Sequence, residues 1–525
     1  MISKLAALKK PLLFALLSGL LLALSCAGPL GWGPAAWIAL IPLMYACTIT
    51  NPRQAAVIGF ICGLVYFTVM LYWVVIVMTT YGHLPWWLSV LIMLLLACYM
   101  SIYPALFSAG FNWMASLISP LWFAPLLWVS LDFIRSKLFT GFPWHDLAYT
   151  QYRFPLLIQT ADLTGHYGIT FLIVLFNTLF FTLIKLLIDK KRLKDRFLQL
   201  DAIVAFILLG SALLYSIVRS HTITAAMKER NIPAIVVQGN VAQDQKWVPG
   251  SLRKTVDTYV RLSQKALAEQ PLSIMIWPET ALPLYPLESD IFPYLVKQLN
   301  ITGNAALLTG APHRENSPNK EAVAYYNSAF LVAANEANTN NTDNVQGRYD
   351  KQHLVPFGEY IPLKEFLPLS GPLVETIGDF TVGKKQPPLT WKGIRMGVLI
   401  CYESIFPELT SDAVSNGANL LVNITNDAWF GRSSAPWQHL SMAVFRAVET
   451  RRSLARAANT GISGFIDPRG DLHQLAPLFE TCFRRAELPI MEIKTCYLLV
   501  GRFFALLCTF CMAAIIFFYW RNRKS

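Results

Sequence analysis

Apolar residues along the chain gather in blocks of about 18 or more positions, each nearly free of charge. A helix of that length crosses roughly 30 Å of hydrocarbon. The pattern therefore predicts eight membrane-spanning helices, over residues 11–29, 31–48, 55–79, 86–110, 115–133, 167–188, 200–218 and 503–520.

Between the seventh and the eighth block lies a long stretch of mixed composition, residues 220–496. Its length suffices for one sizeable core. We therefore expect three parts: a membrane domain with seven spans over residues 1–219, an extramembrane domain over 220–496, and a last span with a cytoplasmic tail over 497–525.

Basic residues orient this arrangement, because short loops rich in Lys and Arg stay on the cytoplasmic side. With eight spans, three basic clusters fall on one side, which places residues 220–496 on the outer face. The clusters are Lys4, Lys9 and Lys10; Lys190, Lys191, Arg192, Lys194 and Arg196; and Arg521, Arg523 and Lys524.

The composition supports a membrane protein, since 54% of the residues are hydrophobic and only 14% are charged. The net charge of +12 is interpreted as mostly topological, with a second role in holding anionic lipid head groups. A nucleic-acid partner is not expected, because the sequence has no aromatic-plus-basic recognition motif.

The extramembrane domain reads as α/β. Short β-rich runs are bounded by turn residues and alternate with amphipathic stretches at 251–268 and 436–452, which predicts a layered core. The runs are Ile235–Val237, Ile274–Trp277, Ala306–Leu308, Met396–Ile400 and Leu420–Val422. The polar stretch 335–344 is interpreted as a surface insertion.

The first candidate for chemistry is Glu279, which ends an apolar strand directly after Pro278. Reactive groups in α/β proteins lie at strand ends, and desolvation there would raise the pKa of a carboxyl towards that of a useful general base. The alternative is a helix N-terminal position, with Glu279 in a first turn.

The second candidate is the loop from Tyr349 to Tyr360, which mixes charge, aromatic rings and turn residues. Lys351 could hold a thiolate and an oxyanion by charge, while Glu359 could orient or receive protons. Taken alone, the loop is better explained by a solvated set of salt bridges.

The third candidate is Cys401, delivered at the end of the strand Gly397–Ile400 and followed by Tyr402 and Glu403. A nucleophile needs such a rigid, partly exposed position, although a lone strand cysteine is more often a small core residue. Base, cation and sulfur together are the minimum for covalent acyl transfer.

Competing chemistry finds less support in the sequence. There is no HExxH, GxSxG or P-loop motif, and no Cys/His cluster has zinc spacing, so neither a metal nor a cofactor is expected. His353 and His439 are interpreted as hydrogen-bonded structural groups.

Glu279, Lys351 and Cys401, in this order, resemble the Glu-Lys-Cys triad of the nitrilase superfamily of carbon–nitrogen hydrolases, an αββα sandwich. The resemblance covers about residues 230–480. A nitrilase-like domain between seven spans and a last one is similar to the apolipoprotein N-acyltransferase family, as are Gly141–Trp144 and Gln238–Asn240.

The resemblance implies roles for these residues. Glu279 is the general base, Lys351 stabilises the oxyanion and Cys401 carries a thioester in a ping-pong reaction. The supporting positions are Trp247, Glu359, Tyr402 and Glu403, and Asn426 and Trp429 are expected to line the same pocket.

The resemblance also implies the substrates and the location. The acyl donor is a phospholipid, commonly phosphatidylethanolamine, and the acceptor is the free α-amino group of a diacylglyceryl-cysteine lipoprotein. The protein is expected in the bacterial cytoplasmic (inner) membrane, with its catalytic domain on the periplasmic face.

Several points stay open at the level of sequence. Residues 361–380 could dip into lipid as a lid or be buried against the sandwich, and Cys482 and Cys496 could form a disulfide. The rival functions are a membrane-anchored amidase and a transporter with an outer binding domain. The transporter finds thin support, since Asp132 and Arg502 lie near predicted span ends.

Overall fold

The computed structural model describes residues 2–115, 118–139, 141–188, 196–244, 246, 250–269, 274–301, 305–316, 323–334, 344–361 and 380–522. The chain divides into two compact units. The helical unit comprises Met1–His221, Ser433–Phe445 and Thr495–Ser525, and the α/β unit comprises Thr222–Arg432 and Arg446–Lys494.

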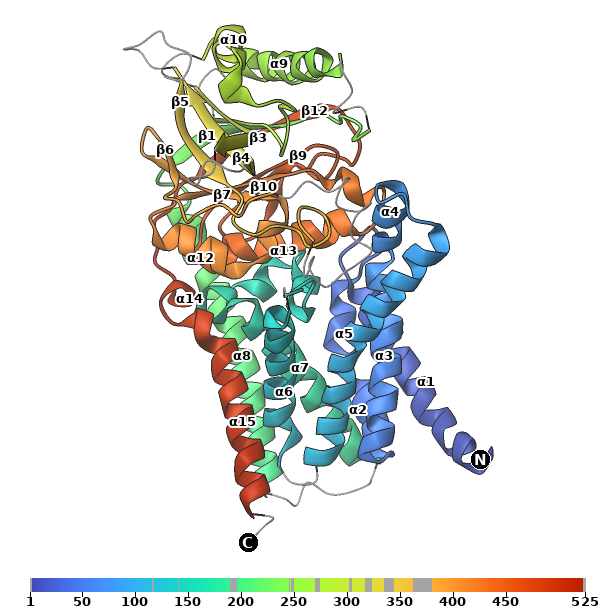
Figure 1. Ribbon diagram of the computed structural model, residues 1–525. Helices are drawn as coiled ribbons and strands as arrows, with labels where there is room; N and C mark the ends of the chain where they lie inside the picture. Colours follow the sequence, from blue (N-terminus) through green and yellow to red (C-terminus); the bar gives the residue numbers. More distant parts are fainter. Residues whose placement is uncertain are drawn as a thin grey trace. The chain divides into compact units, whose positions relative to one another are not determined.

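The helical unit is a bundle of long helices that run side by side (Figure 1). Short 3₁₀ turns connect several of them. In chain order the elements are α1 (Ile2–Ser25), η1 (Gly33–Trp37), α2 (Ile41–Thr48), α3 (Pro52–Leu71), α4 (Trp73–Thr80), α5 (Trp86–Met114), α6 (Pro120–Lys137), η2 (Leu147–Gln151), η3 (Pro155–Ile158), α7 (Ala161–Ile188), α8 (Arg196–Ala226), α14 (Cys496–Leu499), η8 (Gly501–Phe503) and α15 (Phe504–Asn522).

Among the described residues, six helices are long and apolar enough to cross a membrane: Leu8–Ser25, Pro52–Leu71, Trp86–Met114, Ala161–Ile188, Gln199–Ala226 and Gly501–Arg521. The predicted span 31–48 forms instead the shorter η1 and α2, each with a proline in its first turn. Proline fits a helix start but interrupts a helix interior, so one continuous helix does not form there.

The remaining predicted span, 115–133, corresponds to α6, which begins later, at Pro120, and continues to Lys137. The shift adds Arg135 to the helix that already contained Asp132. The count of eight crossings and the domain limits stay predictions.

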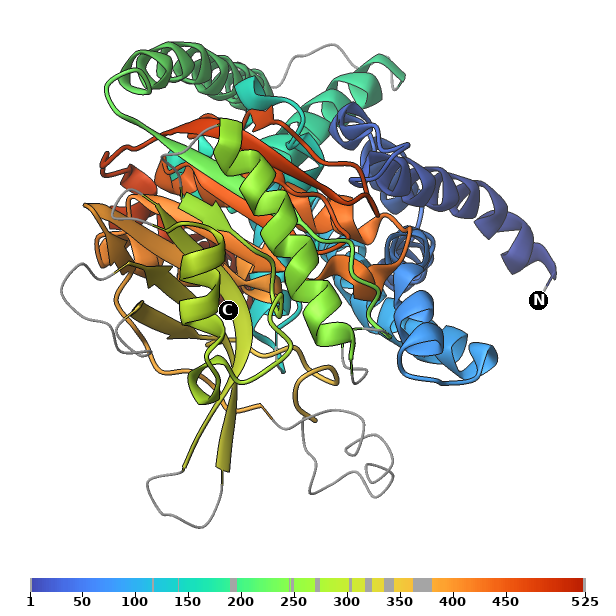
Figure 2. The same cartoon turned by 90° about the horizontal axis from the view of Figure 1, so that it is seen from above.

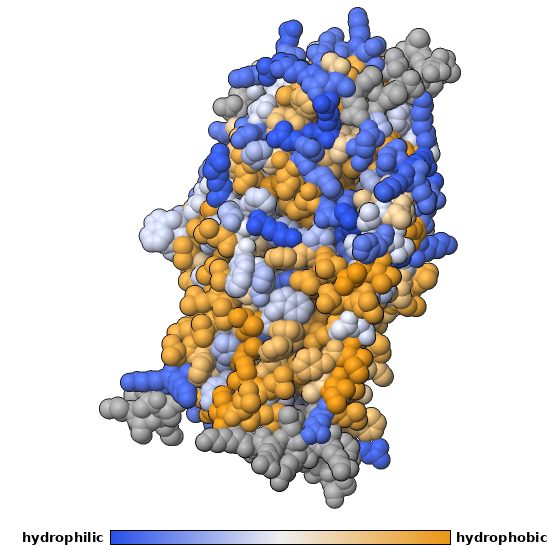
Figure 3. All heavy atoms as spheres, turned by 180° about the vertical axis from the view of Figure 1, so that it is seen from behind, coloured by the Kyte–Doolittle hydropathy of each residue, from blue (hydrophilic) through white to orange (hydrophobic). Residues whose placement is uncertain are grey.

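The long helices turn apolar side chains outward. Apolar residues cover much of the helical unit on the face shown in Figure 3. The side chains that are more than half exposed include Leu13, Leu95, Ile207, Leu214, Phe510 and Phe518. Such a surface is costly in water and suits hydrocarbon as the solvent, which indicates a membrane protein.

The α/β unit is built on two six-stranded sheets. The first has the order β12-β1-β2-β3-β4-β5 and the second the order β11-β10-β9-β8-β7-β6. The first sheet consists of β1 (Asn231–Gln238), β2 (Ile274–Ile276), β3 (Ala306–Asn316), β4 (Val323–Ala333), β5 (Val345–Asp350) and β12 (Cys482–Pro489), and the second of β6 (Leu389–Trp391), β7 (Ile394–Ile400), β8 (Leu420–Thr425), β9 (Leu454–Ala458), β10 (Gly464–Ile466) and β11 (Leu472–His473).

Each sheet has three parallel strands at its centre, β1-β2-β3 in one and β7-β8-β9 in the other, with antiparallel strands outside. The carboxyl ends of parallel strands lie at one edge of a sheet, where α/β proteins place their sites. Glu279 follows β2 and Cys401 follows β7, so both stand at such an edge.

The two sheets pack face to face through one hydrophobic core. Val236, Ile276 and Leu308 of the first sheet and Val398 and Val422 of the second belong to the same buried cluster. In two packed sheets, the side chains of the two inner faces interdigitate to form the core.

Helices cover the outer faces of the sandwich. A second cluster joins the outer face of the first sheet to α9 (Ser251–Glu269) and α10 (Ile291–Gln298), and α9 lies across the strands in the view from above (Figure 2). The second sheet contacts α12 (Pro407–Ser415) through β7. The αββα arrangement expected of the extramembrane domain is thereby confirmed.

Candidate active site

Each of the three predicted reactive residues comes just after the end of a different strand. Glu279 comes three residues after β2, and Lys351 directly follows β5. Cys401 opens the 3₁₀ turn η6 (Cys401–Ile405) with a φ of 52°, a left-handed conformation that few L-residues adopt. Such strained positions persist where the surrounding structure fixes them, and they gather at functional sites.

The structure brings Lys351 between two carboxylates. Lys351 Nζ donates to Glu359 Oε1 over 2.8 Å and lies 3.6 Å from Glu279 Oε1. All three side chains are buried. The cluster formed by Lys351, Glu279, Glu359 and their hydrogen-bond partner Asn327 is called the Lys351 cluster below.

Asn327, on β4, is a member that the sequence did not reveal. Its Nδ2 donates to Glu279 Oε1 over 2.7 Å and to Glu359 Oε1 over 2.9 Å. Its backbone oxygen also accepts from the amide of Lys351 over 2.9 Å. From β4, the strand beside β5, Asn327 therefore holds the lysine and both carboxylates in place.

Glu279 is held from other directions as well. The backbone amide of Asn426 donates to Glu279 Oε2 over 2.9 Å, and the buried Lys246 Nζ donates to the Glu279 carbonyl over 3.2 Å. Behind it lies Gly310, where a Cβ atom would stand 2.7 Å from Glu279 Cα. Only glycine leaves room for this turn.

The charges around the sulfur oppose one another. Burial raises the pKa of the Cys401 thiol well above its ordinary value, the carboxylates of Glu279 and Asp427 raise it further, and Lys351 lowers it. Burial lowers the pKa of Lys351, but Glu359 and Glu279 outweigh burial and keep that pKa above its usual range. The surroundings therefore favour the thiol form of Cys401 and the ammonium form of Lys351, and a nucleophilic sulfur requires a base.

Glu403 ties the cysteine turn to the lysine loop. Its carboxylate accepts from the amides of Ile400 over 2.7 Å and Gln352 over 2.6 Å, and from the Tyr349 hydroxyl over 3.1 Å. Burial raises the pKa of Glu403 to about 7, against these donors. Its contacts are those of a brace between two loops.

The other predicted residues are placed differently. Tyr402 is buried and packs edge-on against Phe406 with ring centroids 5.1 Å apart. Asn426 Nδ2 donates to Gln243 Oε1 over 2.7 Å. Trp429, in η7 (Asp427–Phe430), is 39% exposed.

Trp247 and residues 362–379, the body of the predicted lid, lie outside the described residues. Cys482 and Cys496 both carry free thiols, so the structure contains no disulfide between them.

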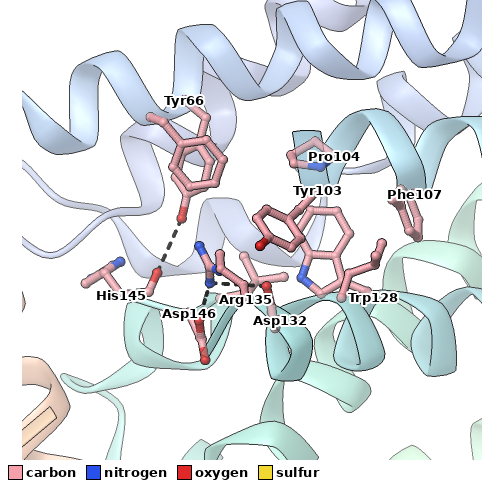
Figure 4. Close-up of a pocket in the computed structure, with 12 residues that line it drawn as sticks. Tyr66, Tyr103, Pro104, Phe107, Trp128, Asp132, Arg135, His145 and Asp146 are labelled. Atoms are coloured by element: carbon pink, nitrogen blue, oxygen red, sulfur yellow. Dashed lines mark hydrogen bonds and ion pairs between the residues drawn. The ribbon is translucent and has the colours of Figure 1, made fainter. Parts of the chain in front are cut away.

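A second buried polar cluster, in the helical unit, was not predicted as a group. Arg135 Nη2 donates to Asp132 Oδ1 over 3.2 Å and to Asp146, whose other oxygen lies 3.0 Å from His166 Nε2. Asp132, Arg135 and Asp146 line a cavity together with Tyr66, Tyr103, Pro104, Phe107 and Trp128 (Figure 4). Asp132, Arg135, Asp146 and His166 are called the Arg135 cluster below.

Comparison with known proteins bears on both units. The family model "Apolipoprotein N-acyltransferase N-terminal domain" matches residues 18–179, and the model "Carbon-nitrogen hydrolase" matches residues 235–493. The second match contains all three of Glu279, Lys351 and Cys401.

Relatives match over nearly the full length. The chain is 42% identical over 524 residues to the apolipoprotein N-acyltransferase of Geobacter metallireducens, covering 98% of this chain and 96% of the relative. It is 31% identical to that of Pasteurella multocida, covering 90% and 88%.

Among solved structures, Saccharomyces cerevisiae Nit3, a member of branch 10 of the nitrilase superfamily, is 18% identical with a TM-score of 0.36, covering 51% of this chain and 93% of Nit3. The near-complete match to relatives, together with both family models, shows that the protein is an acyltransferase of the apolipoprotein N-acyltransferase family.

Proposed function

We propose that Cys401, Glu279 and Lys351 carry the acyl transfer, with a membrane phospholipid as donor and the α-amino group of the S-diacylglyceryl-cysteine of a lipoprotein as acceptor. The observation that supports this most is the Lys351 ammonium, which lies 3.6 Å from one buried carboxylate, is bonded to another, and lowers the pKa of the Cys401 thiol at the end of β7 by its charge. Together they provide a base, an oxyanion partner and a nucleophile.

The first half-reaction loads the enzyme. Glu279 takes the thiol proton, and the Cys401 sulfur attacks the ester carbonyl carbon of the phospholipid. The Lys351 ammonium stabilises the negative charge that develops on the carbonyl oxygen. The bond between that carbon and the glycerol oxygen then breaks, the glycerol oxygen takes the proton from Glu279, and a lysophospholipid leaves a thioester on Cys401.

The second half-reaction unloads it. The neutral α-amine of the lipoprotein attacks the thioester carbon, a C–N bond forms and the C–S bond breaks. Glu279 takes a proton from the attacking nitrogen and delivers it to the departing sulfur. The products are an N-acylated lipoprotein and Cys401 as a thiol, so the site is ready for another donor.

Other residues hold these groups in place. Glu359 accepts a hydrogen bond from Lys351, and Asn327 donates one to Glu279. These two bonds hold the ammonium and the proposed base in place, so that Glu279 stays available to take a proton. Glu403 braces the turn that presents Cys401. Asn426 and the partly exposed Trp429, with Trp247, are proposed to line the space for the acyl chain and glycerol.

Membrane lipids as substrates fit the apolar helices of the chain. Each CH₂ group pulled from lipid into water costs about 0.8 kcal/mol, so an enzyme with two acylated substrates gains from working at the bilayer surface. By the distribution of basic residues, the domain over 220–496 is proposed to stand on the periplasmic face of a bacterial inner membrane.

The donor half-reaction can be tested by intact mass. Purified protein is incubated with phosphatidylethanolamine micelles, and the adduct is treated with hydroxylamine, which cleaves thioesters. We expect a hydroxylamine-sensitive gain of one fatty acyl mass in the wild type and none in Cys401→Ala. Cys401→Ser tests for a hydroxylamine-resistant oxygen ester.

The matched control is Cys482→Ala, which removes another thiol of the α/β unit. It should load as the wild type does. An unmodified wild type after incubation with several phospholipids, or an adduct that survives in Cys401→Ala, would refute the proposed thioester.

A further inference from the structure

Behind Cys401, the second sheet buries a set of polar side chains that the triad does not use. Asn423 and Thr425 lie on β8, Arg456 lies on β9, and Asp427 follows β8. Each of these four residues is 0% exposed. Buried polar groups require hydrogen-bond partners, so their arrangement is constrained as tightly as that of the triad.

Arg456 organises the set. Its Nη2 donates to Asp427 Oδ2 over 2.8 Å, its Nε donates to the Ile462 carbonyl over 3.2 Å, and Nη1 donates to Asn423 Oδ1. Asn423 in turn donates through Nδ2 to the Leu399 carbonyl over 2.9 Å and the Cys401 carbonyl over 3.5 Å. The backbone of the cysteine turn is thus linked to a buried ion pair.

Thr425 links the same ion pair to the sulfur. Ile400 and Ile424 are partners in the parallel register of β7 and β8, so Cys401 and Thr425 are the next residues along the two strands. Thr425 Oγ1 donates to Asp427 Oδ1 over 2.9 Å. Because a hydroxyl has one proton, Thr425 cannot donate to Asp427 and to the sulfur at the same time.

The four groups that act on the Cys401 sulfur come from three strand ends. Glu279 follows β2, Lys351 follows β5, and Thr425 and Asp427 stand at the end of β8. After burial, the carboxylates of Glu279 and Asp427 raise the pKa of Cys401, while Lys351 and a hydrogen bond with Thr425 lower it. Asp427 therefore opposes a thiolate by its charge and competes with it for the Thr425 proton.

We propose that Thr425 is a positioning residue for Cys401. The Thr425 hydroxyl donates its hydrogen bond to Asp427 in the resting site and to the Cys401 sulfur once the thiol is deprotonated. The inference rests on the proposed role of Cys401 as nucleophile. In the resting site the sulfur keeps its own proton and Thr425 donates to Asp427. When Glu279 takes the thiol proton, the Thr425 O–H rotates to the sulfide and Asp427 keeps its bond from Arg456.

The test measures Cys401 without any acyl donor. Full-length protein in detergent is alkylated with iodoacetamide between pH 6 and about 9, and the rate at Cys401 is followed by peptide mass spectrometry. The rate reports the thiolate fraction. We expect Thr425→Val to slow alkylation by about tenfold at each pH, because the thiolate loses a hydrogen-bond donor. Thr425→Ser, which keeps the hydroxyl, should restore the rate.

Asp427→Asn should act in the opposite direction. Removing the negative charge and the competing acceptor should speed alkylation by about tenfold at each pH. Opposite signs distinguish this effect from altered access of the reagent. The matched control is Thr410→Val, since Thr410 is also fully buried in the α/β unit and its hydroxyl finds no partner within the part of the chain that the structure describes.

Thr425→Val and Thr425→Ser leave the Asp427–Arg456 pair intact, so they decide the question even if Asp427→Asn does not fold. An unchanged alkylation rate in Thr425→Val, or a slow rate in Thr425→Ser, would overturn the proposal. Loss of the acyl adduct alone, with the predicted alkylation rates, would instead count against the proposed donor reaction.

Discussion

Both units of the chain bury a cation between two carboxylates, and the two clusters differ in how fully those charges are bonded. In the Lys351 cluster the ammonium is bonded to Glu359 at 2.8 Å and stands 3.6 Å from Glu279. In the Arg135 cluster the guanidinium donates to both Asp132 and Asp146. The formal charges of cation and carboxylates are the same in both.

The choice of cation explains the difference. Arginine is a planar fork that can hold two carboxylates at once and stays charged, and Arg135 also lies over the Phe67 ring, 5.9 Å from its centroid. Lysine is a compact point charge on a flexible stem. Lys351 meets its carboxylates as a point charge and keeps capacity for a further negative charge, whereas Arg135 bonds both of its carboxylates through Nη2 and leaves its Nε without a hydrogen-bond partner among the described residues.

The neighbours differ as well. The Lys351 cluster stands at strand ends beside a cysteine in a left-handed conformation. The Arg135 cluster joins α6, α7 and the loop that carries Asp146, and its walls are aromatic (Figure 4). We propose that the first is arranged for chemistry and the second for holding helices and loop together.

The strongest test of this distinction is Glu279→Gln. The substitution removes the proposed base and keeps the shape, so acyl-enzyme formation should fall by about 10²–10⁴-fold. Single-turnover loading with phosphatidylethanolamine, followed by intact mass, measures it. Glu288→Gln alters a carboxylate whose side chain is 46% exposed and should load at the wild-type rate. Normal loading in Glu279→Gln would assign the base elsewhere.

Arg135→Met should have its main effect on stability. It leaves two buried carboxylates without their cation, which typically costs about 3–5 kcal/mol. Thermal unfolding in detergent should show a clear drop, while loading per folded molecule stays near the wild-type value. Arg253→Met, at a side chain that is 93% exposed, should change stability by less than about 0.5 kcal/mol. A stable Arg135→Met that cannot load would reverse the assignment of the two clusters.

Glu403 sharpens the comparison with a buried carboxyl held by neutral donors. Its pKa is raised by burial from 4.5 to about 7, so its contribution to stability is fully present below pH 4.5 and is lost as pH rises through 7. The loss should amount to about 3 kcal/mol. The unfolding temperature of the wild type should therefore fall relative to that of Glu403→Gln as pH rises from 4.5 to 7. Parallel curves for the two proteins would contradict the assignment.

The sequence predicted the outline of the site because strand ends are visible in it. The apolar run before Cys401 and the Pro278 before Glu279 mark the ends of parallel strands, and the structure brings Glu279 and Lys351 together as expected. Asp467–Gly470, a run of turn-forming residues, lies between the antiparallel strands β10 and β11. Local patterns suffice for features of this kind.

The rest depends on contacts between distant residues. Asn327 and Arg456 look like ordinary polar positions in strands, and their importance appears only when Asn327 meets Glu279 and Arg456 meets Asp427. The Arg135 cluster was missed for the same reason, since Asp146 and His166 are separated from α6 by turns and loops. Hydropathy alone also placed the span 115–133 too early, because Pro120 begins the helix.

Helix α13 (Ala435–Thr450) has a consequence for handling the protein. Its first part belongs to the helical unit and its last turn to the α/β unit, so the chain passes between the units after residue 445, in the middle of a helix, as well as after residues 221, 432 and 494. Residues such as Leu440, Val444 and Phe445 are buried. A fragment trimmed at 221 and 495 would carry this apolar segment without its covering, so it should aggregate; functional reconstitution calls for the intact polypeptide.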